Sequence, residues 1–217
     1  MNKWFMSDPH LGHKNIIKYC GRTMFMTPDE KDQYQKVLDG KIPMKAMSVS
    51  DESLEKMNGY IINAHNARVK NTDIVFCLGD FCFRNTPGGK IGEGVKVKSE
   101  DWMKKMNGNF TFIQGNHDRN NSLSTPIVSC VIEMGRNQIY LCHNPEHIDK
   151  NYDLCFVGHV HNNWKFKKIR YSATNRIIKI VNVGLDVWGF SPCSYNEIMS
   201  GLKRWEKTKE GKIIHEL

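Results

Sequence analysis

The chain has 217 residues, of which 40% are hydrophobic and 25% are charged. This balance is typical of a globular protein and excludes a disordered chain, which would lack the apolar residues that form a core. The 31 Lys and Arg exceed the 23 Asp and Glu, so the formal net charge is +8. A basic surface favours polyanions such as nucleotides or nucleic acids, and a surface kept basic only for solubility is the alternative. The length predicts one domain over residues 1–217.

Targeting signals and cysteine motifs are not expected in this sequence. No apolar run approaches the roughly 18 to 20 residues of a membrane-spanning helix, and the apolar stretch 3–6 is too short for a signal peptide. The seven Cys are irregularly spaced and form no C-x2-C pair, which argues against a zinc ribbon or a thioredoxin-type motif. We therefore expect a cytoplasmic protein with buried, reduced thiols and no membrane partner.

Strand-length apolar runs, rich in β-branched and aromatic residues, recur along the chain. They are residues 3–6, 74–78, 110–114, 127–133, 139–142, 155–157, 166–171 and 177–183. Turn residues at 135–137 and 173–175 predict two hairpins.

Helix signals lie between these strands. Residues 27–30 and 194–197 both have the pattern of a capping box at a helix start. Apolar residues keep helical spacing over 54–64, and a further helix is predicted to begin at Ser99 and to end at Gly108. Helices alternate with strands early in the chain and hairpins dominate late, which predicts an α/β protein with a mixed sheet.

Five polar clusters each follow directly on a predicted strand. They are Asp8-Pro9-His10, Gly79-Asp80, Gly115-Asn116-His117-Asp118, Cys142-His143 and Gly158-His159-Val160-His161. Because the carboxyl ends of parallel strands converge in an α/β sheet, these segments are predicted to meet in one crevice. Imidazole and carboxylate ligands suit Mn, Fe, Ni or Zn, and the lack of Cys ligands in the clusters argues against a closed structural zinc site.

The spacing within two clusters suggests how an ion is held. In an extended D-x-H segment alternate side chains point the same way, so Asp8 and His10 can bind one ion together. The same holds for His159 and His161, unless a turn directs each of them to a different ion. A lone D-x-H or G-D pair is common without function; five clusters in this order at strand ends indicate a metal site.

These clusters resemble the pattern of the calcineurin-like metallophosphoesterases, which runs D-x-H, G-D, G-N-H-[DE], H and G-H-x-H. The likeness is greatest to short single-domain members from bacteria and phages, which share the opening found here at 7–16 and the N-V-x-x-D segment found here at 182–186. Pro9 stands where many relatives have Thr or Ser, and we expect tuning of the site from it rather than loss of ligands. The resemblance implies a four-layer sandwich of two facing mixed sheets flanked by helices.

The resemblance also implies a site with two divalent metal ions, manganese being the expected metal and iron, nickel or zinc the alternatives. One ion would be held by Asp8, His10, Asp80 and His161, and the other by Asp80, Asn116, His143 and His159. His117 would contact the substrate phosphate and Asp118 would orient it. Three further residues are candidate substrate contacts, namely His13, Arg22 and Arg119, and Asp186 is a candidate partner of a site loop.

The implied function is metal-dependent hydrolysis of a phosphate ester, with a hydroxide that bridges the ions attacking phosphorus in line. The basic charge and the lack of an evident cap domain favour a phosphodiester of nucleotide or nucleic-acid type. A phosphomonoesterase, a true nuclease and a non-catalytic metal-binding interaction module are the alternatives. Substrate specificity is expected to lie in the loops 38–50 and 84–98.

Overall fold

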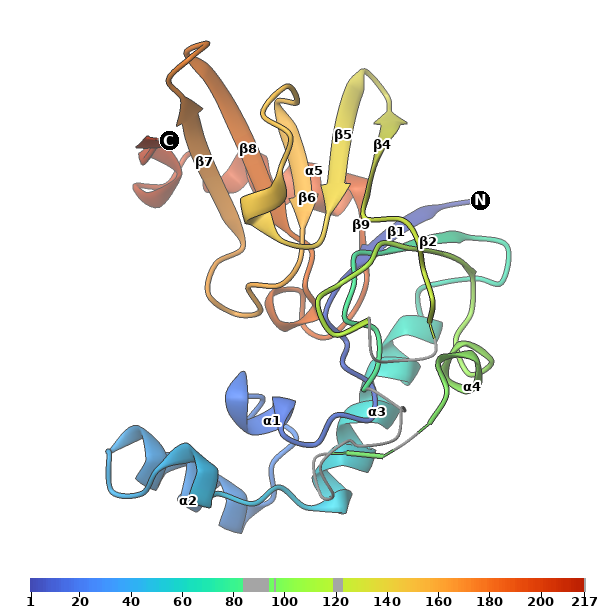
Figure 1. Cartoon of the computed structure of the whole chain (residues 1–217), viewed down its shortest axis with the longest axis vertical. Coiled ribbons are helices and arrows are strands. Elements are labelled where there is room, and N and C mark those ends of the chain that lie inside the picture. The colour runs from blue at the N-terminus through green and yellow to red at the C-terminus, as the bar shows by residue number, and fades with distance from the viewer. Residues whose placement is uncertain (84–93, 96, 119–122, 217) are drawn as a thin grey trace.

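A computed structural model describes residues 1–83, 94, 95, 97–118 and 123–216. Its strands form two sheets, which lie face to face (Figure 1). In the first sheet, β1 (Lys3–Met6), β2 (Ile74–Cys77) and β3 (Asn109–Phe112) run parallel to one another. The short β9 (Cys193–Ser194) pairs antiparallel with β1, so this mixed sheet has the order β3-β2-β1-β9.

The second sheet has six strands in the order β10-β7-β8-β6-β5-β4. They are β4 (Ser129–Met134), β5 (Asn137–Cys142), β6 (Leu154–Val157), β7 (Phe166–Tyr171), β8 (Arg176–Asn182) and β10 (His215–Glu216). The β4–β5 and β7–β8 pairs are the two predicted hairpins, and both are antiparallel. Strands β5, β6 and β8 run parallel, so their carboxyl ends lie at one edge of the sheet.

Five α-helices are described, together with short 3-10 turns. They are α1 (Ile16–Tyr19), α2 (Pro28–Leu38), α3 (Asp51–Asn66), α4 (Ser99–Met103) and α5 (Tyr195–Trp205), and the 3-10 turns are η1 (Met44–Ala46), η3 (Pro145–His147), η4 (Leu185–Val187) and η5 (Glu210–Lys212). Both predicted capping boxes form, the first between Thr27 and Glu30 and the second between Ser194 and Glu197. Each satisfies amide groups that the first helical turn would otherwise leave unpaired.

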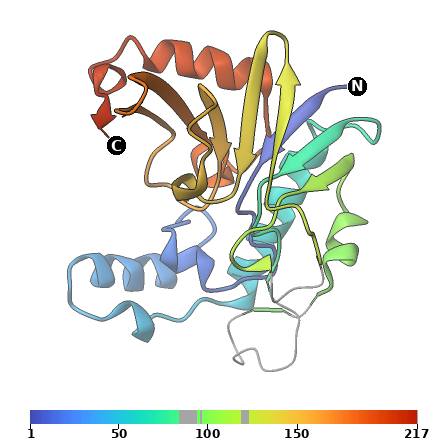
Figure 2. The ribbon, with the colours of Figure 1, turned by 45° about the horizontal axis from the view of Figure 1, so that its top comes forward.

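One hydrophobic core lies between the two sheets. Phe5 of β1 stacks on Phe76 of β2 at 5.4 Å between ring centroids and meets Phe156 of β6 edge-on at 5.0 Å. Phe5 and Phe156 are fully buried, and a buried side chain of this size contributes about 1.5–3 kcal/mol to folding. Leu202 of α5 joins the same core, and in Figure 2 that helix lies against the six-stranded sheet.

A second core lies on the opposite face of the first sheet. There Leu54 and Met57 of α3 and Trp102 of α4 pack on Trp4 and Met6 of β1. The predicted α/β architecture of two facing mixed sheets flanked by helices is confirmed. Helices α1, α2 and α3 gather at the end of the molecule away from the hairpin tips (Figure 1). None of the helices among the described residues is long and apolar enough to cross a membrane.

Candidate metal centre

The polar clusters meet where parallel strands of both sheets end. Asp8 follows β1, Asp80 follows β2 and Asn116 follows β3 of the first sheet. His143 follows β5 and His159 follows β6 of the second sheet. Because the two sheets face each other, their strand ends bring segments 151 residues apart into contact: the amide of His159 donates to Asp8 Oδ2 at 2.9 Å.

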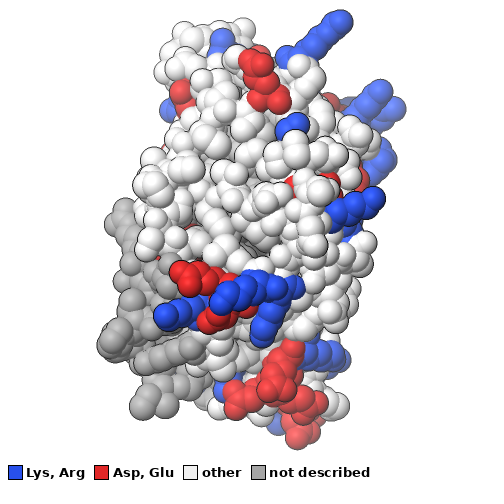
Figure 3. Space-filling view, turned by 90° about the vertical axis from the view of Figure 1, so that its right-hand side faces the viewer, with Lys and Arg blue, Asp and Glu red and all other residues white. Residues whose placement is uncertain are grey.

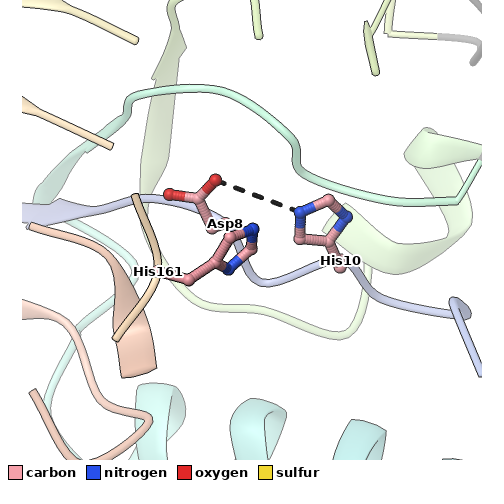
Figure 4. Close-up of side chains that lie close together, drawn as sticks. All are labelled: Asp8, His10 and His161. Atoms are coloured by element: carbon pink, nitrogen blue, oxygen red, sulfur yellow. Dashed lines mark ion pairs between the residues drawn. The ribbon is translucent and has the colours of Figure 1, made fainter. Parts of the chain in front are cut away.

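One group of side chains that could hold a metal ion consists of Asp8, His10 and His161, drawn in Figure 4. Their ligand atoms lie within 4.8 Å of one another. Asp8 Oδ1 and His10 Nε2 are 4.0 Å apart, and both are buried without a hydrogen-bond partner in the described part of the chain. Unpaired buried polar atoms are costly, and metal–ligand distances near 2.0–2.2 Å allow one ion to contact both atoms. The group therefore fits a divalent cation.

A second group consists of Asp80, His143 and His159, again within 4.8 Å. Asn116 joins it, because its Oδ1 lies 2.9 Å from His143 Nε2 and 2.9 Å from His159 Nδ1. His143 Nδ1 lies 2.7 Å from the Leu78 carbonyl oxygen, an acceptor only. This contact places the proton on Nδ1, so Nε2 is the nitrogen that could bind a metal ion.

Asp80 belongs to the second group and also lies close to the first. Its Oδ2 is 3.6 Å from His10 Nε2 of the first group and 3.4 Å from His143 Nε2 of the second. Its Oδ1 accepts a hydrogen bond from the His117 amide at 2.8 Å, which leaves Oδ2 directed at both groups. One carboxylate oxygen is thus within reach of ligands from two adjoining sites.

The backbone at these clusters is held in a conformation that L-residues seldom adopt. Positive φ angles of 47° to 71° occur at five candidate ligands, namely Asp8, His10, Asp80, His159 and His161. Each costs of order 1–3 kcal/mol, and such residues concentrate at functional sites, where the surrounding structure holds them. A left-handed residue also turns its side chain out of the strand direction. The extended D-x-H geometry expected for Asp8 and His10 is therefore replaced by a left-handed backbone at both residues.

Glycines in three of the motifs allow the loops that carry the polar clusters to approach one another closely. A Cβ on Gly79, which has a φ of +95°, would lie 2.6 Å from both the Gly115 Cα and His143 Nδ1. On Gly115 it would lie 2.2 Å from Asp80 Oδ1, and on Gly158 it would meet the hydroxyl of Ser7 and lie 2.6 Å from Asp8 Oδ2. Only a residue without a side chain fits at these positions.

Arg22 lies behind the first group and not at an accessible surface. Its side chain is completely buried; Nε and Nη2 donate to the two oxygens of Asp186 at 2.8 and 2.9 Å. Nη2 and Nη1 also donate to the carbonyls of Asp8 and Pro9. These donors are therefore used inside the protein, and a contact between Arg22 and the substrate stays a prediction. Asp186 Oδ2 in turn lies 3.1 Å from His161 Nδ1, a carboxylate–imidazole pair that orients a metal-binding nitrogen.

Asp118 binds backbone amides of the loops that form the site. Its carboxylate accepts from the amides of Asp80 and Gly115, both at 2.8 Å, and of Phe81 at 3.2 Å. It thereby joins the loops after β2 and β3. That it also orients His117 stays a prediction.

His117 and His13 border the first group on its solvent side. The His117 side chain is exposed, and its ring centroid is 5.3 Å from that of His10. The His13 ring lies 5.6 Å from His10 and packs on Phe83 at 4.9 Å. Both imidazoles thus border the first group, and their contact with a substrate stays a prediction. Arg119, the remaining predicted contact, lies outside the described residues, as do 84–93 and 96 of the predicted specificity loop 84–98.

The electrostatics of the site follow from buried, opposed charges. Burial raises the pKa of Asp8 and lowers that of His10 well below its usual range. Burial opposes a charge on His143 and His161 too. It is outweighed by the hydrogen bonds that the two imidazoles donate to Asp80 and Asp186, which raise the two pKa values to about 9 and about 10. The carboxylates of Asp80 and Asp186 therefore stabilise positive charge at the candidate metal centre.

Two polar residues that the sequence analysis did not assign to the site support it. Ser7 donates from its hydroxyl to the Leu78 carbonyl at 2.7 Å, which links the ends of β1 and β2. Asn182 donates to the His161 carbonyl at 2.7 Å and accepts from the Gly184 amide at 2.8 Å, so it holds the segment that carries Asp186. Both lie inside the opening and closing motifs, which is the signal that could have found them.

Comparison with known proteins places this geometry in context. No protein-family model matches the chain. It is 28% identical over 217 residues to the uncharacterized protein MJ1445 of Methanocaldococcus jannaschii, an alignment covering 99% of this chain and 97% of that one. Among solved structures, a protein of unknown function from Aquifex aeolicus superimposes with a TM-score of 0.56 at 18% identity, over 92% of this chain and 98% of that one. This likeness shows a shared fold.

A phosphoesterase from E. coli, YfcE, aligns with a TM-score of 0.34 at 12% identity, over 84% of this chain and 78% of that one. A match at this score carries no argument by itself. The case for function therefore depends on the motifs and on the geometry of the centre.

Proposed function

We propose that the protein is a metal-dependent phosphoesterase of the calcineurin-like kind, with two divalent ions held by the two ligand groups. The observation that carries this proposal is the position of Asp80 Oδ2, within 3.6 Å of one group's imidazole and 3.4 Å of the other's. Single-ion sites do not need a carboxylate shared between two sets of ligands. Adjoining ions clamp the attacking and leaving oxygens of a phosphoryl group, which is the recurring use of such centres.

The donor set supports Mn, Fe, Ni or Zn, because it combines imidazole with carboxylate and one amide oxygen. The first ion would be held by Asp8, His10, Asp80 and His161, and the second by Asp80, Asn116, His143 and His159. When bound, the ions supply Lewis-acid activation of water and positive charge for the phosphate. The two carboxylates neutralise only part of that charge, so an anionic ester is favoured at the centre.

The chain's own groups complete the reaction. His117 lies at the exposed edge of the centre, where its imidazole can donate a hydrogen bond to a phosphate oxygen and a proton to the leaving oxygen. Its amide is bound to Asp80 Oδ1 at 2.8 Å, so the residue is positioned by the carboxylate shared between the two groups. The buried Arg22–Asp186 pair holds His161 in orientation from behind.

We propose a phosphodiester of nucleotide type as the substrate. The net charge of +8 supports an anionic ligand. On the face drawn in Figure 3, however, basic and acidic side chains lie interspersed beside a broad uncharged area. The coloured part of this face therefore shows no continuous basic track of the kind that a long nucleic acid binds.

The test is hydrolysis of bis-p-nitrophenyl phosphate and p-nitrophenyl phosphate by metal-stripped protein, with Mn, Ni, Zn or Mg added back singly. We expect metal-dependent turnover, faster on the diester, that Asp80→Asn and His117→Ala reduce at least a hundredfold. The matched controls Asp32→Asn and His215→Ala alter exposed side chains outside the centre and should retain full activity. Two ions bound per chain without turnover would point instead to a metal-binding interaction module, and faster monoester hydrolysis to a phosphomonoesterase.

A further inference from the structure

A pocket of about 510 Å³ opens beside the second ligand group. Asn116, His143 and His159 form the wall that it shares with the centre, and from there it extends over the start of β4 and the end of β5. Its volume is within the 300–1,000 Å³ that is usual for small-molecule sites. A phosphate at the metal centre would therefore have one of its substituents directed into a cavity large enough to hold it.

The far wall of this pocket is apolar and aromatic. Val128, which is 65% exposed, stands beside Tyr140 and the buried Cys142. The Tyr140 ring is held in place by Tyr152, stacked at 5.5 Å between centroids and 23° between planes. A flat apolar ligand would cover the exposed valine and contact a tyrosine ring whose orientation is already set. Such pre-positioned aromatic walls favour planar ligands.

The rim of the pocket is polar but carries no fixed charge. Gln114, Asn144 and His147 supply amides and an imidazole; Lys, Arg, Asp and Glu are absent from the lining residues that the structure describes. The Asn144 side chain accepts from the Glu146 amide at 2.9 Å, and Gln114 Nε2 donates to the Thr125 carbonyl at 3.2 Å, so both amides are held in position. Amide hydrogen-bonding groups beside an aromatic wall suit an uncharged ring with a polar edge. A second phosphate would find no lysine or arginine among the described lining residues.

We propose that this pocket binds the nucleobase of the substrate, with Val128 and Tyr140 as specificity-determining residues. The proposal rests on the proposed phosphoesterase function, since the metal centre binds the phosphate from which the nucleoside extends. It assigns a use to Tyr140 and His147, which lie outside the ligand groups. The metal centre selects for charge, and the pocket selects for the uncharged planar part of the same molecule.

The test compares kcat/KM for thymidine 5′-(p-nitrophenyl phosphate) and methyl p-nitrophenyl phosphate. Both esters carry the same charge and the same leaving group, so their ratio isolates the nucleoside. We expect the wild-type ratio to exceed about 10, and Val128→Arg to lower it at least tenfold, the size of effect that filling a binding pocket has. Ile177→Arg makes the same kind of change at an exposed β-branched residue on β8, away from the pocket lining and from Tyr140, and should leave the ratio unchanged.

A binding measurement separates failure of the pocket from failure of the catalytic proposal. In calorimetry of the metal-loaded protein, thymidine 5′-monophosphate should bind at least tenfold more tightly than inorganic phosphate, and Val128→Arg should remove that preference. Hydrolysis of both esters with a ratio near one, or an equal loss of both in Val128→Arg, would overturn the nucleobase pocket while leaving the phosphoesterase intact. If neither ester is hydrolysed, the phosphodiesterase proposal fails, and equal affinities for the two phosphates would overturn the pocket as well.

Discussion

Arg22 and Asp186 form a buried, bidentate ion pair between residues 164 positions apart in the sequence, with N–O distances of 2.8 and 2.9 Å. The pair does not face solvent; it faces His161, whose Nδ1 lies 3.1 Å from Asp186 Oδ2. Each of the three side chains thus sets the position of the next. A guanidinium fixes a carboxylate, and the carboxylate fixes an imidazole of the metal centre.

Asp186→Asn should weaken metal binding at the first ligand group by about 10- to 100-fold, because the orienting carboxylate raises the basicity of the ligand imidazole. Titration of metal-stripped protein with Mn, followed by calorimetry, measures this. Asp32→Asn, an exposed carboxylate on α2, is the matched control and should bind metal normally. Unchanged affinity in Asp186→Asn would show that His161 needs no support from behind.

Arg22→Met should destabilise the fold by about 3–5 kcal/mol, since it leaves the buried carboxylate of Asp186 unpaired. The free energy of unfolding from a urea titration measures the cost. The double variant Arg22→Met, Asp186→Asn should recover part of it, because the uncompensated charge is then gone.

The exposed pair Lys104–Asp101 offers the comparison for that experiment. Lys104→Met breaks an ion pair in solvent and should cost less than about 1 kcal/mol. If Arg22→Met cost no more than Lys104→Met, the buried pair would have no special part in stability.

Gly158→Ala should destabilise the protein and impair metal binding together, because the new methyl group would overlap Ser7 and lie 2.6 Å from Asp8 Oδ2. Gly59→Ala is the opposite case. It lies within α3, no atom stands within 4 Å of its added Cβ, and replacing a helical glycine should stabilise by about 1 kcal/mol. The thermal unfolding temperature and the metal content of both variants measure these effects. A shift of stability in the same direction in both variants would contradict the prediction.

Asp73 should make the protein sensitive to acid. It is buried, and the hydrogen bonds from the Asn2 amide, the Trp4 indole and the Lys70 amide lower its pKa from 3.8 to about 2. A carboxyl with a lowered folded-state pKa stabilises the fold above the unfolded value of 3.8. That stabilisation is lost as the pH falls through about 2.

Asp73→Asn should therefore be less stable than the wild type at pH 7, and the difference should narrow below pH 4. Urea unfolding at a series of pH values measures it. A difference between the two proteins that stayed constant from pH 7 to pH 2 would mean that the charge of Asp73 is not what stabilises the β1–β2 connection.

Local patterns decided much of the secondary structure in advance. The capping boxes at Thr27 and Ser194 form because their partners are three residues away, and the turns at 135–137 and 173–175 join hairpins as predicted. The short α1 and the two-residue β9 were not predicted. β9 exists because it pairs with β1, almost 190 residues away, and no local pattern encodes that pairing.

The candidate ligands of the centre could likewise be predicted from the sequence, because residue types and their place at strand ends are local properties. The sequence alone determined which imidazoles and carboxylates follow the strands, and it paired Asp8 with His10. Residue spacing alone left open whether His159 and His161 share an ion, and the family resemblance implied that they do not. The tertiary structure places His161 with Asp8 and His10 and places His159 with Asp80 and His143, with a left-handed backbone at both histidines. It also decided that Arg22 is buried on Asp186 and that a pocket lies beside Asn116. Such contacts arise from packing between distant segments, which sequence spacing does not encode.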